Sequence, residues 1–549
     1  MQSLDLSKVM RKINIRVTNL RPDQALSYPL ALLCGNVTED VLSVSVQNVT
    51  EKAPSSTPWP VVGRNFRALV RLVPGRNVVR FSCFTSTHDF PLHYVPLKDR
   101  VGKYVRLVYV VSDDDFENGR FQGPADEDCS AESGCKRICL GAQILQTAVA
   151  ETLGSAGFPR KTFRLEESDN GVPVCRVFKT SLSVMQLHEM GGEDCWRFLK
   201  NELNASSLGD SSAKFLAFLA CTRYASGLDE PETQSEILSR TRGHVMIGGG
   251  DVAVCGTGCL YTWAENLQQV PRRLMDLRRV DRRNFMDDSN YREVRWACYS
   301  SSLGGVLHEL GHVFDLAHTA KGIMGQGFHD LQRLYIASRN DRQLKDPEDN
   351  ELGKVTSWGS RPSKHYSCCT AELQNAVPVS SAFSLAESDT GGTSRGKKLR
   401  LTVLQPKTRS VGGALREDRN AEKPCELFWS KSCATILNYH KWLNPGVPNG
   451  AEPPKFDGQR FASPHGIRLI EFREPETSTV IHFRDFPEGP KEVSFSNKDL
   501  WPLLASERND GIGNQECGGH LDLLVIDVRG NILKGRLAVP LPEESADVV

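Results

Sequence analysis

The residues best placed to carry out chemistry lie in one stretch, GGVLHELGHVFDLAHTAKGIMGQGF. It contains His308, Glu309, His312 and His318 at set spacings, with Met324 shortly after them. Residues four apart share one face of a helix, so His308 and His312 can direct imidazole nitrogens at one zinc ion while Glu309 reaches a water on that ion. Three neutral imidazoles are enough to hold zinc and leave one position open for the water.

The spacing is specific. With 13 histidines in 549 residues, a His-Glu-x-x-His pattern arises by accident roughly 0.02 times in a chain of this composition. The chemistry it predicts is hydrolysis of a carbonyl compound. Zinc lowers the pKa of its bound water toward about 7, Glu309 accepts the proton as general base, and the hydroxide attacks the substrate carbonyl. Glu309 then passes the proton to the leaving amine.

The pattern HExxHxxxxxH followed by GIM resembles the metzincin clan of zinc endopeptidases. In that clan the third histidine follows a tight turn and a methionine lies beneath the metal. The order of a β-rich start, a long helix, this motif and a β-rich end is also similar to a family of zinc metalloproteinases found in fungi and animals, some with a jacalin-like C-terminal domain. The resemblance implies His308, His312 and His318 as metal ligands, Glu309 as the base and Met324 as the floor of the site.

Two positions depart from the metzincin pattern. Glycine usually stands three residues after the second histidine, where the helix ends with positive φ, but this chain has Asp315. Aspartate tolerates that conformation, so the chain can still turn and deliver His318; if the helix continues instead, Asp315 lies on the ligand face as a third ligand or as an acceptor for an imidazole N–H. No tyrosine follows Met324 directly. Tyr335 and Tyr366 are candidates to replace one, but a buried structural tyrosine is the favoured interpretation of either.

The elements around the motif predict a multidomain α+β protein, with a metzincin-like zinc peptidase domain between an N-terminal β-sandwich and a C-terminal β domain. We expect these parts: a β-sandwich over 1–100, the peptidase domain over 101–383, a flexible insertion over 384–424, a helix packing on the peptidase domain over 425–450, and a β domain, on the family resemblance a candidate jacalin-like one, over 451–549. The insertion is rich in Gly, Ser, Thr and charge, which is typical of segments without a packed core.

Within the expected peptidase domain, residues 131–157 read as a long helix ended by glycine, and 161–167 and 213–224 read as strands. Two glycine-linked strands follow, over 244–250 and 252–261. An extended peptide pairs well with an exposed strand, so either of these two could hold a substrate along a sheet edge; a glycine-bearing bend without any ligand is the alternative.

Composition limits the partners. Lys and Arg (67) balance Asp and Glu (67), so no global field concentrates nucleic acid or anionic lipid, and no nucleic-acid partner is expected. The six arginines of residues 271–283 read as a solvated face, with a local acidic or nucleic-acid site as the alternative. No apolar run of eighteen residues and no signal-peptide core occur, which predicts a cytoplasmic, or else nuclear, protein without a transmembrane segment.

The leading hypothesis is a zinc-dependent endopeptidase acting on a protein or peptide, with Zn²⁺ as cofactor. A zinc-containing binding or scaffold protein, acting on carbohydrate or lipid through its β domains, is a second hypothesis, and the presence of the base Glu309 speaks against it. A zinc hydrolase for a non-peptide amide is a third, because the activated water is the same.

Overall fold

The computed structural model describes residues 13–97, 102–337, 427–444, 452–458, 460–495 and 519–539. Its N-terminal part is built from eight strands that hydrogen bond in the order β1-β3-β6-β5-β4-β7-β8-β2. They are β1 (Ile15–Val17), β2 (Gln24–Leu26), β3 (Leu30–Val37), β4 (Ser43–Asn48), β5 (Thr57–Val62), β6 (Asn65–Arg71), β7 (Gly75–Cys83) and β8 (Ser86–Tyr94). Along β7 buried and more exposed residues alternate, as expected of strands with one face on a core.

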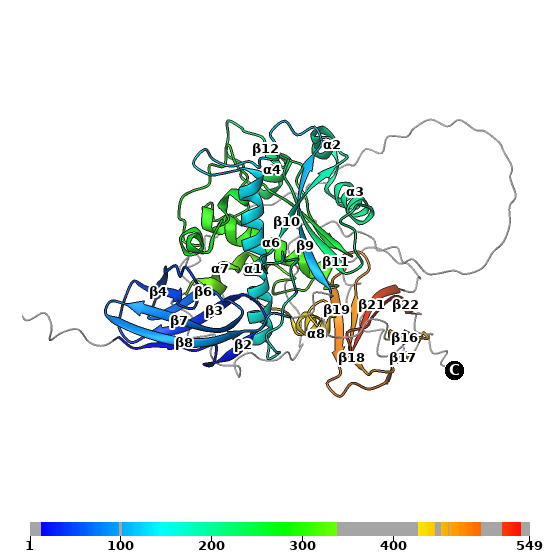
Figure 1. Ribbon diagram of the computed structural model, residues 1–549. Helices are drawn as coiled ribbons and strands as arrows, with labels where there is room; N and C mark the ends of the chain where they lie inside the picture. Colours follow the sequence, from blue (N-terminus) through cyan, green and yellow to red (C-terminus); the bar gives the residue numbers. More distant parts are fainter. Residues whose placement is uncertain are drawn as a thin grey trace, which may run out of the picture. The chain divides into compact units, whose positions relative to one another are not determined.

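A mixed five-stranded sheet forms the second part, in the order β10-β9-β11-β15-β14. Figure 1 labels three of its strands, β9, β10 and β11. Its strands are β9 (Tyr104–Ser112), β10 (Cys175–Thr180), β11 (Ala213–Leu219), β14 (Met246–Gly249) and β15 (Val252–Gly256). The first four strands in this order are parallel, whereas β14 runs antiparallel to β15 at the sheet edge. Strand β11 is buried at every position, as is typical of a strand covered on both faces.

The long helix α1 (Ala131–Ser155) lies between these two groups of strands, because it contacts β3 as well as β9 and β10. The Ser130 side chain caps its first turn by accepting a hydrogen bond from the Ser133 N–H. Most of its residues are buried, and the helix meets the N-terminal strands through a hydrogen bond of 2.6 Å from the Thr147 hydroxyl to the Leu30 carbonyl. The predicted helix over 131–157 is confirmed.

The remaining helices and strands complete the described chain. The helices are α2 (Val184–Glu189), α3 (Gly192–Ala205), α4 (Gln234–Ser239), α5 (Val270–Arg273), α6 (Arg295–Val313), α7 (Gln332–Tyr335) and α8 (Lys431–Tyr439), with short 3-10 turns η2 (Leu260–Thr262), η3 (Leu267–Gln269) and η4 (Gly327–Asp330). The strands are β12 (Arg223–Tyr224), β13 (Thr241–Arg242), β16 (Lys455–Phe456), β17 (Arg460–Ala462), β18 (Ile467–Arg473), β19 (Val480–Asp485), β20 (Glu492–Ser494), β21 (Gly519–Asp527) and β22 (Ile532–Val539). Strands β19, β18, β21 and β22 form one sheet in that order.

The mixed α+β architecture with large β-sheets is therefore confirmed, and one predicted strand is wrong. Residues 161–167 make only isolated bridges, from Leu165 to Val105 and from Glu167 to Pro173. Further along β9 the same side is taken by β10 from Leu107 onward. The insertion predicted over 384–424 lies outside the described residues, as does Tyr366. Among the helices that the structure describes, none combines the length and the apolar character that a membrane crossing requires.

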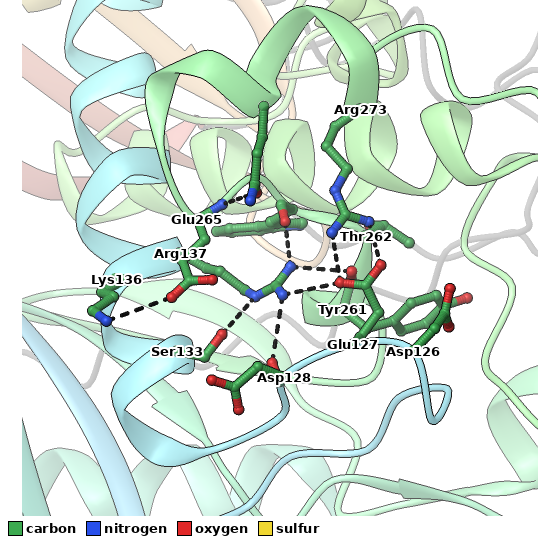
Figure 2. Close-up of polar contacts among 12 residues, drawn as sticks. Asp126, Glu127, Asp128, Ser133, Lys136, Arg137, Tyr261, Thr262, Glu265 and Arg273 are labelled. Atoms are coloured by element: carbon green, nitrogen blue, oxygen red, sulfur yellow. Dashed lines mark hydrogen bonds and ion pairs between the residues drawn. The ribbon is translucent and has the colours of Figure 1, made fainter.

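The sequence predicts the arginines of residues 271–283 on a solvated face, and for Arg273 and Arg282 this prediction is wrong. Figure 2 shows Arg273 and Arg137 converging on the carboxylate of Glu127. Arg273 approaches it within 2.5 Å, Arg137 within 3.1 Å, and all three side chains are buried. Arg282 forms ion pairs with Asp287 and Glu293. Arg273 thus connects α5 to the loop that contains Glu127, and Arg282 connects parts of the segment between α5 and α6.

Candidate metal centre

Helix α6 (Arg295–Val313) carries the first two histidines and the glutamate of the motif on successive turns. It is buried along nearly its whole length, and two of its glycines permit close packing. A Cβ at Gly304 would collide with the Phe328 carbonyl, and one at Gly311 with the sulfur of Met324. The helix is thereby fixed against the segment that contains the GIM sequence, and Met324 packs directly on it.

The helix ends where the resemblance placed the turn. Its last residue is Val313, and Asp315 adopts a φ of 66°. Aspartate is one of the few non-glycine residues that occupy this left-handed region readily. The chain then leads to His318, so the alternative in which the helix continues and Asp315 faces the ligands is wrong.

The three histidine rings meet at their Nε2 atoms. The Nε2 of His312 lies 3.1 Å from the Nε2 of His308 and 3.1 Å from that of His318. Each Nδ1 contacts a backbone carbonyl oxygen instead: Ile323 for His308 and Leu316 for His312, both at 2.9 Å, and Thr477 for His318 at 3.0 Å.

These contacts fix the protonation of the rings. A carbonyl oxygen only accepts hydrogen bonds, so each Nδ1 carries the proton and donates it, which leaves a lone pair on each Nε2 of the neutral ring. The three Nε2 lone pairs then converge on one point, where they repel one another unless a cation lies between them. Three nitrogens bound to tetrahedral zinc at about 2.0–2.1 Å are about 3.3 Å apart, close to the spacing found here. The donor set therefore fits zinc.

Burial keeps the imidazoles in the neutral form that binds metals. It lowers the pKa of His308 to about 4, with the nearby His318 ring acting in the same direction. The pKa values of His312 and His318 are also lowered, again mainly by burial. All three rings are therefore free of a second proton at neutral pH, as ligation requires. Within the described part of the chain this is the one cluster of three or more His, Cys, Asp or Glu side chains close enough to hold a metal ion.

Glu309 is a buried carboxylate with one oxygen, Oε2, that has no hydrogen-bond partner among the described residues. Burial raises its pKa to about 8, and a hydrogen bond from the main chain of Gly248 opposes this shift. Gly248 belongs to the edge strand β14, which passes so close to α6 that a Cβ there would collide with the Glu309 backbone. A carboxyl group of this kind is a candidate proton acceptor and donor.

The other residues singled out in the sequence have different partners. The Asp315 carboxylate accepts hydrogen bonds from Lys534 at 2.5 Å and from the ring of His440 at 3.1 Å. Burial alone would raise the pKa of this carboxyl, but Lys534 and His440 hold it well below its usual range. Tyr335 is buried and donates its hydroxyl to the Ile144 carbonyl at 2.6 Å, a structural role.

Sequence reasoning missed the contribution of the turn between β18 and β19. The main chain of His318 bonds this turn in both directions, from its N–H to the Ser478 carbonyl and from the Val480 N–H to its own carbonyl. Together with the contact to Thr477, this places a segment about 160 residues later in the chain directly behind the third histidine. No local sequence pattern predicts a contact between residues so far apart in the chain.

Fold and site together define an α+β protein with three histidines close enough to hold a metal ion, beside a buried glutamate. Over residues 14–376, more than half of its length, the chain matches the peptidase family Metallopep, described as "Putative peptidase family", and it belongs to that family. Two fungal proteins, both named as putative zinc metalloproteinases, are similar to it. The one from Saccharomyces cerevisiae is 23% identical over 59% of this chain and 49% of its own length. The one from Schizosaccharomyces pombe is 23% identical over 53% and 48%.

The chain thus spans about half the length of these two relatives. Among solved structures, wild-type OgpA from Akkermansia muciniphila is 13% identical, with 80% of this chain and 96% of OgpA covered and a TM-score of 0.37. A structure of catalytically inactive OgpA with an O-glycopeptide substrate gives 12% identity, coverage of 80% and 95%, and a TM-score of 0.38. Scores this low support no statement about this chain.

Proposed function

We propose that this chain is a zinc-dependent endopeptidase with His308, His312 and His318 as ligands, as in metzincins, and with Glu309 as general base. The observation that carries the proposal is the convergence of three Nε2 lone pairs, each oriented by an Nδ1–H that donates to a backbone carbonyl. Such carbonyl partners orient ligating imidazoles and raise their basicity. The names of the two fungal relatives agree with zinc as the metal.

A zinc ion held there would polarise the substrate carbonyl and activate a water molecule. The chain itself moves the proton. Glu309 accepts the proton from the attacking water and returns it to the leaving amine, a role suited to a carboxyl whose pKa burial has raised to about 8. Its unpartnered oxygen is available for that water.

The substrate would lie along β14. This strand stands at the edge of the five-stranded sheet and has one hydrogen-bonded neighbour, β15, among the described strands. Its Gly248 lies against the backbone of Glu309, so a peptide added to its outer side would run past the base and the histidines. This geometry favours a protein or peptide substrate over a small amide.

We also propose the domain division expected from the sequence. Strands β1–β8 fall within 1–100, the mixed sheet and α6 fall within 101–383, α8 falls within 425–450, and β16–β22 fall within 451–549. These assignments place each element in one part and leave the metal centre in the second.

The test is Glu309→Gln beside His318→Ala, with metal analysis and cleavage of an unfolded protein substrate with and without a chelator. We expect Glu309→Gln to retain stoichiometric zinc without cleaving, because the amide cannot accept the proton, and His318→Ala to lose zinc. Retained hydrolysis in Glu309→Gln would refute the base. A wild-type chain that holds zinc but cleaves no protein would favour the zinc-containing binding protein.

A further inference from the structure

We propose that the turn between β18 and β19, residues 474–479, is a positioning element of the metal centre: it holds His318 in its ligating orientation, so that tight metal binding depends on the C-terminal strands. This inference rests on the proposed function. The turn lies beyond residue 376, where the match to the peptidase family ends. The third ligand would then be supported from outside the matched region.

Three hydrogen bonds connect His318 to this turn. Its N–H donates to the Ser478 carbonyl at 3.0 Å, and its carbonyl accepts from the Val480 N–H at 2.9 Å. Its ring Nδ1 donates to the Thr477 carbonyl at 3.0 Å. The first two fix the main chain of His318 as in a short parallel bridge, and the third fixes the rotation of the imidazole. Backbone and ring are therefore held by the same few residues.

The rings of the other two ligands have their carbonyl partners outside this turn. His308 and His312 are held by helix α6, and their Nδ1 atoms donate to carbonyls of Ile323 and Leu316, close by in sequence. His318 lies beyond the end of the helix, outside any named helix or strand. Of the three ligands, it is the one whose orientation would relax if the C-terminal strands moved away.

The turn is itself well ordered by internal contacts. The Glu474 N–H donates to the Thr479 carbonyl, and the Ser478 N–H donates to the Glu474 carbonyl, both at 2.9 Å. The Thr477 hydroxyl contacts the Glu474 carboxylate and the Thr479 hydroxyl. Ser478 has a φ of 51°, in the left-handed region that a β-branched side chain rarely occupies. The turn is thus preformed, which a positioning element requires.

A second attachment secures the start of the same connection. The Arg473 guanidinium, at the end of β18, donates to the Asp315 main-chain carbonyl at 2.7 Å. The side-chain carboxylate of Asp315 accepts hydrogen bonds from Lys534 and His440. The segment from Asp315 to His318 is therefore held at both of its ends by residues after 427. It carries His318 itself and the Leu316 carbonyl that contacts the ring of His312, so its placement acts most directly on His318.

The experiment uses the full chain, stripped of metal, and measures Zn²⁺ affinity by competition with a chromophoric chelator and the visible absorption of the Co²⁺-substituted form. Ser478→Val strains the turn, whereas Ser478→Gly, its matched control, suits a positive φ. Thr477→Gly loosens the turn without adding any atoms. We expect Ser478→Val and Thr477→Gly to lower Zn²⁺ affinity about 10–100-fold and to alter the Co²⁺ spectrum, and Ser478→Gly to resemble the wild type.

The outcomes separate the possible failures. If the wild type itself binds neither metal, the proposed function fails. If the wild type binds tightly and both Ser478→Val and Thr477→Gly match its affinity and Co²⁺ spectrum, the positioning role is overturned. This holds even if the unfolding midpoints of the metal-free variants shift, because a turn with only a structural role would change stability without changing metal binding. Should Ser478→Val fail to fold by circular dichroism, Thr477→Gly decides in the same way.

Discussion

Replacing Gly248 with alanine tests whether the edge strand β14 and helix α6 must be in backbone contact for the proposed reaction. A Cβ at Gly248 would lie 2.7 Å from the carbonyl carbon and 2.9 Å from the Cα of Glu309, with the carbonyl oxygen closer still. Real Cβ atoms essentially never come within 3.0 Å of a neighbour, and ordinary contact begins at 3.4 Å. The neighbour is backbone, which cannot rotate away, so β14 and α6 must separate by about 1 Å before even the Glu309 carbonyl oxygen is at a tolerable distance.

The adjacent glycine supplies a matched control. A Cβ at Gly249 meets only the ring of Trp196, at 3.6 Å, an ordinary van der Waals contact. Overpacking costs about 1–3 kcal/mol of stability, and a misplacement approaching 1 Å near reacting groups can cost about 100-fold in rate. We therefore expect Gly248→Ala to lose 1–3 kcal/mol and about two orders of magnitude in kcat/KM (about 2.7 kcal/mol), and Gly249→Ala to lose little of either.

The assay is urea unfolding of both variants, together with steady-state cleavage of a protein substrate by the zinc-loaded chain. The refuting result is specific. If Gly248→Ala cleaves as fast as Gly249→Ala while both are folded, then the spacing of β14 and α6 does not matter to the reaction, and the placement of the substrate along β14 is wrong.

Three further outcomes are expected. Glu127→Gln should lose about 3–5 kcal/mol in urea unfolding at pH 7, because Arg137 and Arg273 would stay buried without their carboxylate. Burial tends to raise the pKa of Glu127, but the two arginines outweigh burial and lower this pKa. The contribution of the Glu127 carboxylate to stability is therefore complete above the unfolded pKa of about 4.3 and decreases as pH falls. An equal loss of unfolding free energy in Glu127→Gln at pH 7 and at pH 3 would contradict this. Asp315→Ala should be about 1 kcal/mol less stable than Asp315→Gly, since both lose the carboxylate but only alanine resists a φ of 66°; equal unfolding midpoints would contradict it. Free Zn²⁺ at 100 times its Kd should stabilise the stripped chain by about 2.7 kcal/mol, and calorimetry showing no shift would argue against the three-histidine centre.

The motif itself could be predicted because its geometry is local. Helical spacing alone places His308 and His312 on one face, and the six-residue step to His318 needs only a turn at Asp315. The long helix α1 was predictable for the same reason, since its apolar pattern and its ends lie within one stretch. The roles of the ligands remain a proposal, but the structure does bring the named rings together.

Contacts between distant segments could not be predicted. The six arginines of residues 271–283 look solvated in the sequence, yet Arg273 is buried because Glu127, 146 residues earlier, neutralises it. The pattern of residues 161–167 is strand-like, but β10 occupies most of that side of β9. In each case the result depends on which distant segment of the chain packs against the residue or strand, and the local sequence pattern carries no information about that.

Asp315 shows how a departure from a motif can be explained by such a distant partner. Glycine, which the metzincin resemblance leads one to expect there, would adopt the φ of 66° at lower cost. It could not, however, accept the charge-assisted hydrogen bonds from Lys534 and His440 that the carboxylate accepts. Aspartate is among the few residues that satisfy both requirements, the left-handed turn and the hydrogen bonds to Lys534 of β22 and to His440 at the end of α8. The substitution is therefore explained by the C-terminal strands, on whose turn His318 also depends for its three hydrogen bonds.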